Sequence, residues 1–169
     1  MTGAGWIVRD AIPGRDAAAC AEIYAPFVRD TVVSFEEEAP SAEEFEGRIR
    51  STQATHPWLV LEDASVVVGY AYASTHRTRA SYRWAADVTV YIGPSHRGMG
   101  VGRRLYTELL DRLRAQRFQV ACAGITLPND ASVGLHERFG MTKVAHFPEV
   151  GFKFGRWIDV GYWQRVFRP

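Results

Sequence analysis

The fold is decided by the stretch DVTVYIGPSHRGMGVGRRLYTELLDRL, which covers residues 87–113. Val88, Val90 and Ile92 alternate with Thr89 and Tyr91, and this alternation, rich in β-branched residues, predicts a strand. Apolar residues then recur every four positions from residue 101 to residue 113, which predicts a helix with one broad apolar face. Pro94 lies between the two, and because it cannot donate to a ladder it indicates the end of the strand.

A glycine-rich loop joins the strand to the helix. Its residues are Arg97, Gly98, Met99, Gly100, Val101 and Gly102. Glycine lets a ligand approach the backbone closely, and the first turn of a helix offers unpaired N–H groups to an anion. The loop fits R-x-x-G-x-G, whereas a dinucleotide fingerprint would need glycine at position 103 and a P-loop would need Gly-Lys-Ser/Thr. We therefore expect a phosphate or pyrophosphate site, in preference to a turn that merely joins two elements.

The composition indicates one domain over residues 1–169, with a formal net charge of +1 that implies no nucleic-acid partner. Cys20 and Cys122 lie in apolar contexts, and neither they nor the histidines have metal-ligand spacing, so we expect no metal. Residues 1–5 show no basic start or apolar run, and no stretch approaches membrane-spanning length. These features predict a cytoplasmic protein without a signal peptide.

The order of elements predicts a mixed α/β fold. Strands are expected at residues 6–9, 58–62, 66–74, 118–125, 141–147 and 152–167, and helices at residues 15–27, 41–52 and 128–139. Pro26 predicts that the first helix ends early or kinks. A linker is expected at residues 30–40 and a polar, basic loop at residues 75–83.

The R-x-x-G-x-G loop, set between a strand and a long helix, resembles the GNAT superfamily of acyl-CoA-dependent N-acetyltransferases. Further segments resemble its phosphinothricin acetyltransferase branch: PWLV at 57–60, GYAYA at 69–73, TVY at 89–91, LPND at 127–130, SV at 132–133, LHE at 135–137 and DVGYWQ at 159–164. The resemblance spans residues 6–167. It implies a twisted, mixed and mostly antiparallel sheet flanked by helices, with splayed central strands that admit acetyl-CoA. It also implies a homodimer.

Asp87 is the first candidate for the proton acceptor in acetyl transfer. The resembled branch has glutamate at this position as its proposed general base. Aspartate is one methylene shorter, so a bridging water could complete the contact with the amine. The alternative is a structural carboxylate at the start of a strand, which pairs with Arg83 or caps a turn.

His136 is the second candidate, because it occupies the position at which the superfamily often has a tyrosine that protonates the departing thiolate. Histidine can act as acid or base near neutral pH, and the sequence leaves that role open. Packing on the helix explains it as well. Asn129 resembles the asparagine that binds the pantetheine arm, and a plain N-cap is the alternative. The same resemblance assigns pantetheine contacts to the backbone of Val90, Tyr91 and Ile92.

Four residues are candidates for binding the amine substrate. Arg77 and Arg79 are two apart, so they point the same way if the segment is extended, and a guanidinium suits carboxylate, phosphinate or sulfonyl oxygens. A solvated basic loop is the alternative. Phe35 and Glu36 match a family segment at the substrate entrance.

The resemblance implies an acetyl-CoA-dependent enzyme that acetylates the α-amine of a small amino-acid analogue such as phosphinothricin, methionine sulfoximine or methionine sulfone. Two alternatives remain open at this stage. One is a protein N-terminal or polyamine acetyltransferase on the same fold. The other is an acetyl-CoA-binding sensor without turnover.

Overall fold

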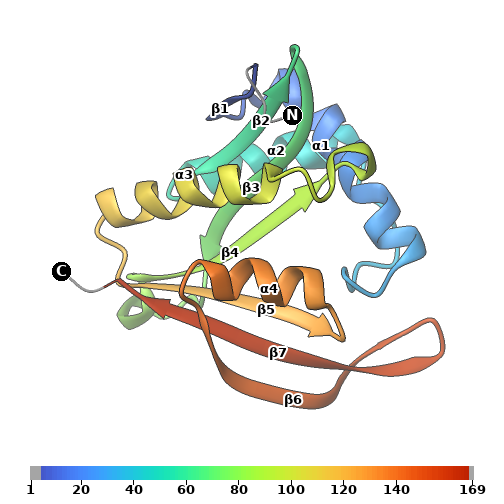
Figure 1. Cartoon of the computed structure of the whole chain (residues 1–169), viewed down its shortest axis with the longest axis vertical. Coiled ribbons are helices and arrows are strands. Elements are labelled where there is room, and N and C mark those ends of the chain that lie inside the picture. Colours follow the sequence, from blue (N-terminus) through green and yellow to red (C-terminus); the bar gives the residue numbers. More distant parts are fainter. Residues whose placement is uncertain (1–4, 168–169) are drawn as a thin grey trace.

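The computed structural model describes residues 5–167 and has the expected mixed α/β organisation (Figure 1). We expected no signal peptide from residues 1–5, and of these residues 1–4 lie outside the described residues. The strands are β1 (Ile7–Asp10), β2 (Trp58–Asp63), β3 (Val66–Thr75), β4 (Ala85–Ile92), β5 (Val120–Leu127), β6 (Thr142–Lys153) and β7 (Arg156–Val166). The helices are α1 (Pro13–Asp30), α2 (Ala42–Gln53), α3 (Val101–Ala115) and α4 (Asp130–Arg138), with short 3₁₀ turns at Ala80–Tyr82 and Pro94–His96.

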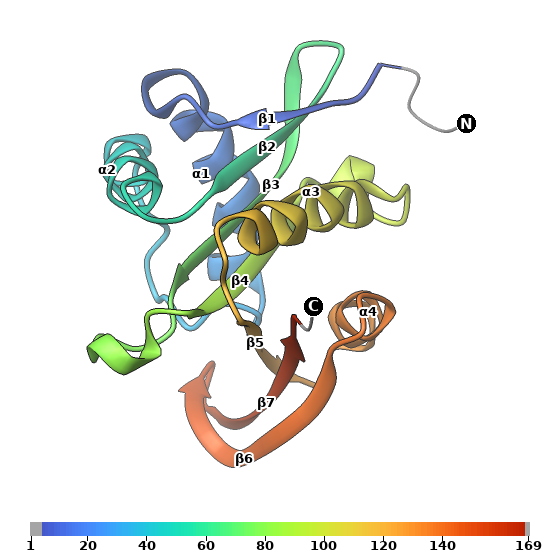
Figure 2. The same cartoon turned by 90° about the vertical axis from the view of Figure 1, so that its left-hand side faces the viewer.

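The strands form one seven-stranded sheet in the order β1-β2-β3-β4-β5-β7-β6. Helices α1 and α2 pack on one face and α3 on the other, as the edge-on view shows (Figure 2). Strand β2 explains why the core has two halves. Leu59 and Leu61 join the core under α3, whereas Trp58 and Val60 join the core under α1 and α2. Its unbroken apolar run is therefore that of a strand buried on both faces.

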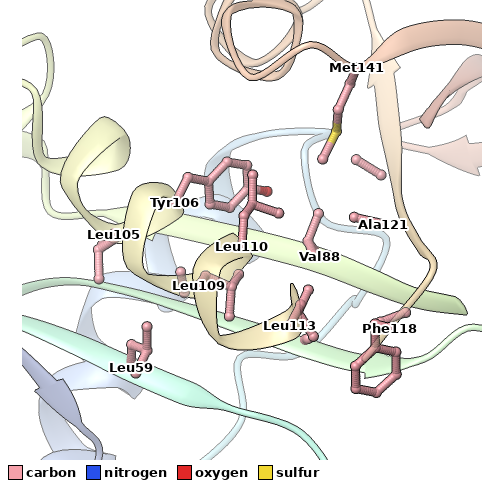
Figure 3. Close-up of a cluster of buried hydrophobic side chains, with 14 of the residues drawn as sticks. Leu59, Val88, Leu105, Tyr106, Leu109, Leu110, Leu113, Phe118, Ala121 and Met141 are labelled. Carbon is pink, nitrogen blue, oxygen red and sulfur yellow. The ribbon is translucent and has the colours of Figure 1, made fainter. Parts of the chain in front are cut away.

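Helix α3 confirms the apolar face predicted from its four-residue spacing. Leu105, Tyr106, Leu109 and Leu113 are each 0% exposed. Figure 3 shows these side chains projecting from α3 within the buried cluster that also contains Val88 of β4. Burying an aliphatic side chain of this size contributes about 1.5–3 kcal/mol. This packing fixes the start of α3, and with it the glycine-rich loop, against the sheet.

The central strands β4 and β5 splay apart, as the family resemblance implied. They are parallel, and they pair only through Ala85–Asp87 of β4 and Val120–Cys122 of β5. Beyond the Asp87–Cys122 pair each strand continues for five residues without its partner, and β5 pairs with β7 on its other side. Figure 1 shows the two strands leaving one another along this stretch. The other strand pairs of the sheet are antiparallel.

Two boundary predictions were wrong for identifiable reasons. Helix α1 runs through Pro26 to Asp30, because Tyr24 and Val28 are buried on either side and their packing offsets the lost backbone hydrogen bond. Strand β6 is continuous through Pro148, where we expected a break. Irregular register between residues 147 and 151 accommodates the proline, as β-bulges commonly do.

Other local predictions were confirmed. Ser41 and Glu44 form the capping box that begins α2. The linker expected at residues 30–40 contains no helix or strand from residue 31 onward, since α1 ends at Asp30. Strand β5 is present as predicted, although its boundaries were wrong: it begins and ends two residues later than expected. Among residues 5–167, no helix combines the length and the apolar composition that a membrane span requires.

Candidate active site

The gap between β4 and β5 encloses a cavity of about 100 Å³. Its lining includes Val90 and Tyr91 from β4, Gly124 and Ile125 from β5, and Asn129 and His136 at α4. The separated strands leave backbone groups there without a neighbouring strand, and such groups bind amides of an inserted ligand well. Residues of β4 and α4 that the sequence predicted for the site thus line the same cavity, which we call the slot.

The glycine-rich loop lies at the open end of β4. Gly98 and Gly100 have φ of 74° and 96°, the left-handed region that favours glycine. Gly100 is the N-cap of α3, and that helix has neither a side-chain cap nor an acidic residue in its first turn. Its N–H groups and positive helix end therefore remain available to an anion. Arg97 is exposed beside this loop, with its guanidinium 4.7 Å from the centre of the Phe27 ring.

Gly102 has a different role from the two loop glycines. A Cβ at this position would lie 3.0 Å from Ile92 Cδ1 and 3.3 Å from Leu135 Cδ2. Gly102 therefore allows α3 to approach both β4 and α4 closely. Val101, beside it, is 1% exposed and belongs to the core, whereas Met99 is 48% exposed.

Asp87 stands at the closed end of the gap. Its Oδ1 lies 2.7 Å from Nδ1 of His76, and since an ionised carboxylate only accepts, Nδ1–H donates this hydrogen bond. Burial raises the pKa of Asp87, and the His76 hydrogen bond and the charge of Arg77 oppose that rise. The alternative pairing with Arg83 is wrong, because the Arg83 guanidinium donates to the carbonyl of Ala80 instead.

Cys122 faces Asp87 across the last paired rung of the two strands. The residue is 8% exposed, and burial raises the pKa of its thiol to about 11. The sulfur, an oxygen of Asp87 and a nitrogen of His76 all lie within 4.8 Å of one another. Three polar side chains thus converge at the end of the slot.

His136 is 4% exposed, and both of its ring nitrogens are occupied. Nδ1 lies 2.7 Å from the carbonyl oxygen of Ser132, so Nδ1–H donates there, and Nε2 accepts from the Tyr106 hydroxyl at 2.9 Å. Burial lowers the pKa of His136 and raises that of Tyr106. The ring is therefore neutral and connected to the Tyr106 hydroxyl, which also lines the slot.

Asn129 is the N-cap of α4, and its Oδ1 accepts from the backbone N–H of Ser132 at 3.2 Å. The N-cap interpretation is therefore confirmed. Asn129 also lines the slot, so its position is compatible with the ligand-binding interpretation as well.

A second cavity, of about 230 Å³, lies on the face of the sheet covered by α1 and α2. Tyr24, Trp58, Tyr72 and Tyr91 form much of its wall, and Arg48 contributes a charge. Tyr91 lines both cavities. The two spaces therefore adjoin at β4, one on each side of the strand that carries Asp87.

Glu36 is held at this second cavity by side chains that the sequence did not reveal. Arg48 donates to both of its oxygens, at 2.7 and 2.9 Å, and the Tyr24 hydroxyl donates at 2.9 Å. The pKa of Glu36 is lowered, and the largest cause is the pair of hydrogen bonds from Arg48. Burial, the next largest influence, acts in the opposite direction. Glu36 is therefore an ionised carboxylate whose charge is already paired.

The hairpin of β6 and β7 supports the linker from which Glu36 projects. The buried Lys153 Nζ donates to the carbonyl oxygens of Val28, Ser34 and Glu36, at 2.6, 2.7 and 2.9 Å. Phe35 packs where Gly151 leaves room, since a Cβ on that glycine would come within 2.2 Å of the Phe35 ring. These contacts place Phe35 and Glu36 as one unit.

The basic loop differs from the expected extended segment. The chain bends after His76 and enters the 3₁₀ turn at Ala80–Tyr82, so the two-residue spacing of Arg77 and Arg79 gives no common direction. Both arginines are exposed. Arg77 lies 6.0 Å from the centre of the Tyr82 ring, and its charge lowers the pKa of Asp87. Arg77 is thus electrostatically coupled to the closed end of the gap.

The sequence profile of a family described as "Acetyltransferase (GNAT) domain" matches residues 10–161. The chain belongs to the GNAT acetyltransferase family. Its curated relatives include a phosphinothricin N-acetyltransferase from Streptomyces viridochromogenes, 40% identical over 90% of this chain and 83% of the relative. A methionine sulfoximine/methionine sulfone acetyltransferase from Salmonella typhimurium is 36% identical over 88% of each chain.

A solved GNAT structure supports the same fold. A phosphinothricin acetyltransferase from Sinorhizobium meliloti, in complex with acetyl-CoA, superimposes with a TM-score of 0.91 at 34% identity, over 95% of this chain and 88% of the other. The resemblance drawn from sequence segments is therefore confirmed at the level of family and fold.

Three features of this GNAT site escaped sequence analysis. His76, Tyr106 and Arg48 each contact a predicted residue: Asp87, His136 and Glu36 respectively. The contacts join residues 11, 30 and 12 positions apart on different elements. No local motif spans such separations, so only the folded chain brings them together.

Proposed function

We propose that this chain is an acetyl-CoA-dependent N-acetyltransferase that acetylates the α-amine of a small amino-acid analogue of the phosphinothricin, methionine sulfoximine or methionine sulfone type. The observation that carries the proposal is the slot between β4 and β5, with Asp87 at its closed end. At its open end lie the glycine-rich loop and the uncapped start of α3, which together form an anion-binding site that we call the cradle. Asp87 and Ile92 are five residues apart, or roughly 16 Å along a strand. The names of the relatives support the substrate class.

In this proposal the cradle holds the phosphates of acetyl-CoA. Backbone N–H groups at Gly98, Gly100 and the first turn of α3 would bind them, and Arg97 would add a charge-assisted hydrogen bond. The backbone of residues 90–92 and Asn129 would bind the pantetheine arm. An arm held along β4 would deliver the thioester to the closed end of the gap, and holding two reactants together in this way contributes roughly 7–11 kcal/mol to catalysis.

Asp87 would take the proton of the attacking amine, directly or through one water. His76 is the positioning residue, because its Nδ1–H holds one carboxylate oxygen and leaves the other free. A backbone N–H on the unpaired part of β4 would stabilise the developing oxyanion. The departing thiolate would take a proton from the Tyr106 hydroxyl, and the resulting tyrosinate would regain a proton from solvent. Neutral His136 would position that hydroxyl through the hydrogen bond at its Nε2.

The acceptor would enter on the side of β4 that carries the second cavity. Arg77 and Arg79 provide exposed guanidinium groups for the acidic or sulfonyl end of the substrate. Phe35 would supply an apolar wall. Because Glu36 is already paired with Arg48, its role in the proposal is to shape and polarise the entrance.

We also propose a cytoplasmic homodimer assembled through the β6–β7 hairpin. Six large apolar side chains there are between 48% and 62% exposed: Val144, Phe147, Val150, Phe152, Phe154 and Trp157. A cluster of this kind is typical of an interaction surface. Light scattering at micromolar concentration tests the proposal, and a monomer would contradict it.

A thiol-release assay with acetyl-CoA against a panel of amines tests the function. We expect methionine sulfone, methionine sulfoximine and phosphinothricin to be acetylated far better than methionine, because the exposed guanidinium groups of Arg77 and Arg79 can pair with polar oxygens that methionine lacks. Arg79→Ala should raise KM with a smaller effect on kcat. Efficient turnover of spermidine or an uncharged peptide, indifferent to changes at Arg77 and Arg79, would contradict the proposed substrate class.

A further inference from the structure

We propose that His76, Asp87 and Cys122 form a Zn²⁺-binding site at the closed end of the gap between β4 and β5, and that zinc bound there blocks acetyl transfer. The binding site follows from the geometry of the three side chains alone. The inhibitory effect rests on the proposed function, because it requires Asp87 to be the proton acceptor.

Three different elements bring the ligands together. Asp87 and Cys122 are partners in the last paired rung of β4 and β5. His76 follows β3, in which Ser74 pairs with Asp87. The candidate ligand atoms all lie within 4.8 Å of one another, and His76 Nδ1 is already 2.7 Å from Asp87 Oδ1. Spacings of 11 and 35 residues explain why the sequence shows no metal motif.

The donor set suits zinc, which prefers imidazole nitrogen, thiolate sulfur and carboxylate oxygen in a tetrahedral arrangement. Bond lengths of 2.0–2.3 Å place tetrahedral ligands about 3.4–3.6 Å apart. The imidazole and carboxylate would therefore separate by less than about 1 Å, while Cys122 stays on β5. The Asp87 side chain is 39% exposed and that of His76 is 21% exposed, so solvent can supply the fourth ligand.

The binding step balances without any change of oxidation state. The Cys122 thiol loses its proton to solvent as the sulfur–zinc bond forms. The hydrogen bond between His76 and Asp87 breaks, and the imidazole proton moves from Nδ1 to Nε2, which frees Nδ1 for the metal. One proton is released per zinc. With its oxygen coordinated, Asp87 no longer accepts the proton of an amine.

Cobalt titration of the untagged full chain tests the site. Co²⁺ substitutes for zinc, and a cysteine ligand produces a thiolate-to-cobalt charge-transfer band, with intense visible bands if coordination is tetrahedral. We expect both signals, a stoichiometry of one metal per chain by equilibrium dialysis, and loss of the bands when Zn²⁺ is added. Cys122→Ser should remove the charge-transfer band.

Matched controls are available in the same chain. Cys20 is the other described cysteine and is fully buried. His146 makes a similar 2.7 Å contact with Asp159, away from the gap. Cys20→Ala and His146→Ala should retain the cobalt spectrum, whereas His76→Ala should weaken zinc binding by at least the roughly 10–100-fold that loss of an outer-shell partner costs. Circular dichroism establishes that each variant is folded.

Inhibition is measured separately. Micromolar zinc should suppress turnover of wild-type protein, a chelator should restore it, and Cys122→Ser should be active and resistant to zinc. A cobalt spectrum without a thiolate band, or equal zinc affinity in wild type and Cys122→Ser, would overturn the site. Metal binding at Cys122 that leaves turnover unaffected would retain the site and refute the block. Absence of turnover without zinc would instead count against the proposed function.

Discussion

Replacing His76 by alanine should displace the acidic limb of the pH–activity profile. Burial raises the pKa of Asp87, and the hydrogen bond from His76 is the largest influence that opposes the rise. Removing the donor leaves the burial effect less compensated, so the pKa of Asp87 rises further. A base works only when deprotonated, and activity should therefore fall off at a higher pH than in the wild type.

The size of the displacement follows from one charge-assisted hydrogen bond of 2.7 Å. Such bonds contribute about 1.5–3 kcal/mol, and because the Asp87 side chain is 39% exposed we take the lower end. About 1.5 kcal/mol corresponds to about one pH unit. The limb of kcat/KM should accordingly move upward by about one pH unit.

The assay is the initial rate of thiol release with methionine sulfone at saturating acetyl-CoA, measured across pH. His146→Ala is the matched control, since it removes a histidine that contacts an aspartate at the same distance outside the gap. That control should keep the wild-type profile. A His76→Ala profile that is merely lower in amplitude, with its acidic limb unmoved, would refute the reasoning about Asp87.

Three further predictions concern the cofactor, the linker and stability. Gly100→Glu should abolish the CoA binding that calorimetry measures in the folded protein, because a φ of 96° is strained for glutamate and its charge would repel phosphate. Unchanged affinity would show that the loop is not part of the cofactor site. Lys153→Met should lower the free energy of unfolding by about 2–4 kcal/mol in urea titrations, because three carbonyl oxygens lose a buried hydrogen-bond donor. It should also raise KM for the amine, and an unaltered KM would show that the linker has no part in substrate binding. Asp87→Asn should raise Tm at neutral pH. The folded state raises the pKa of the Asp87 carboxyl, so the stability of the protein declines as pH rises from the unfolded pKa through the folded pKa, and the uncharged amide avoids this loss. A lower Tm with the fold intact would contradict that sign.

The parts of this structure that sequence predicted are those set by local periodicity. Helix α3 and its glycine-rich start followed from residues 97–113, because apolar spacing and left-handed glycines are properties of one continuous segment. Parallel pairing of β4 with β5 also followed, since a helix links the two strands. The family resemblance added the splay, which periodicity does not encode.

The remaining features depend on contacts between distant segments. His76 reaches Asp87 only through the register of β3 and β4, and Tyr106 reaches His136 only through the packing of α3 against α4. Tertiary packing also overrode the local signal at Pro26. We expected Arg77 and Arg79 to point the same way in an extended segment, and this was wrong because the backbone of residues 76–82 bends. Single-domain organisation and the roles of the individual site residues stay predictions.

The most direct test of the account measures turnover and CoA affinity together in Asp87→Ala. If Asp87 takes the amine proton at the end of a slot that binds acetyl-CoA independently, turnover of methionine sulfone at neutral pH should fall by about 10²–10⁴-fold. The CoA dissociation constant from calorimetry should stay near the wild-type value. Wild-type turnover across pH in this variant would contradict the central claim.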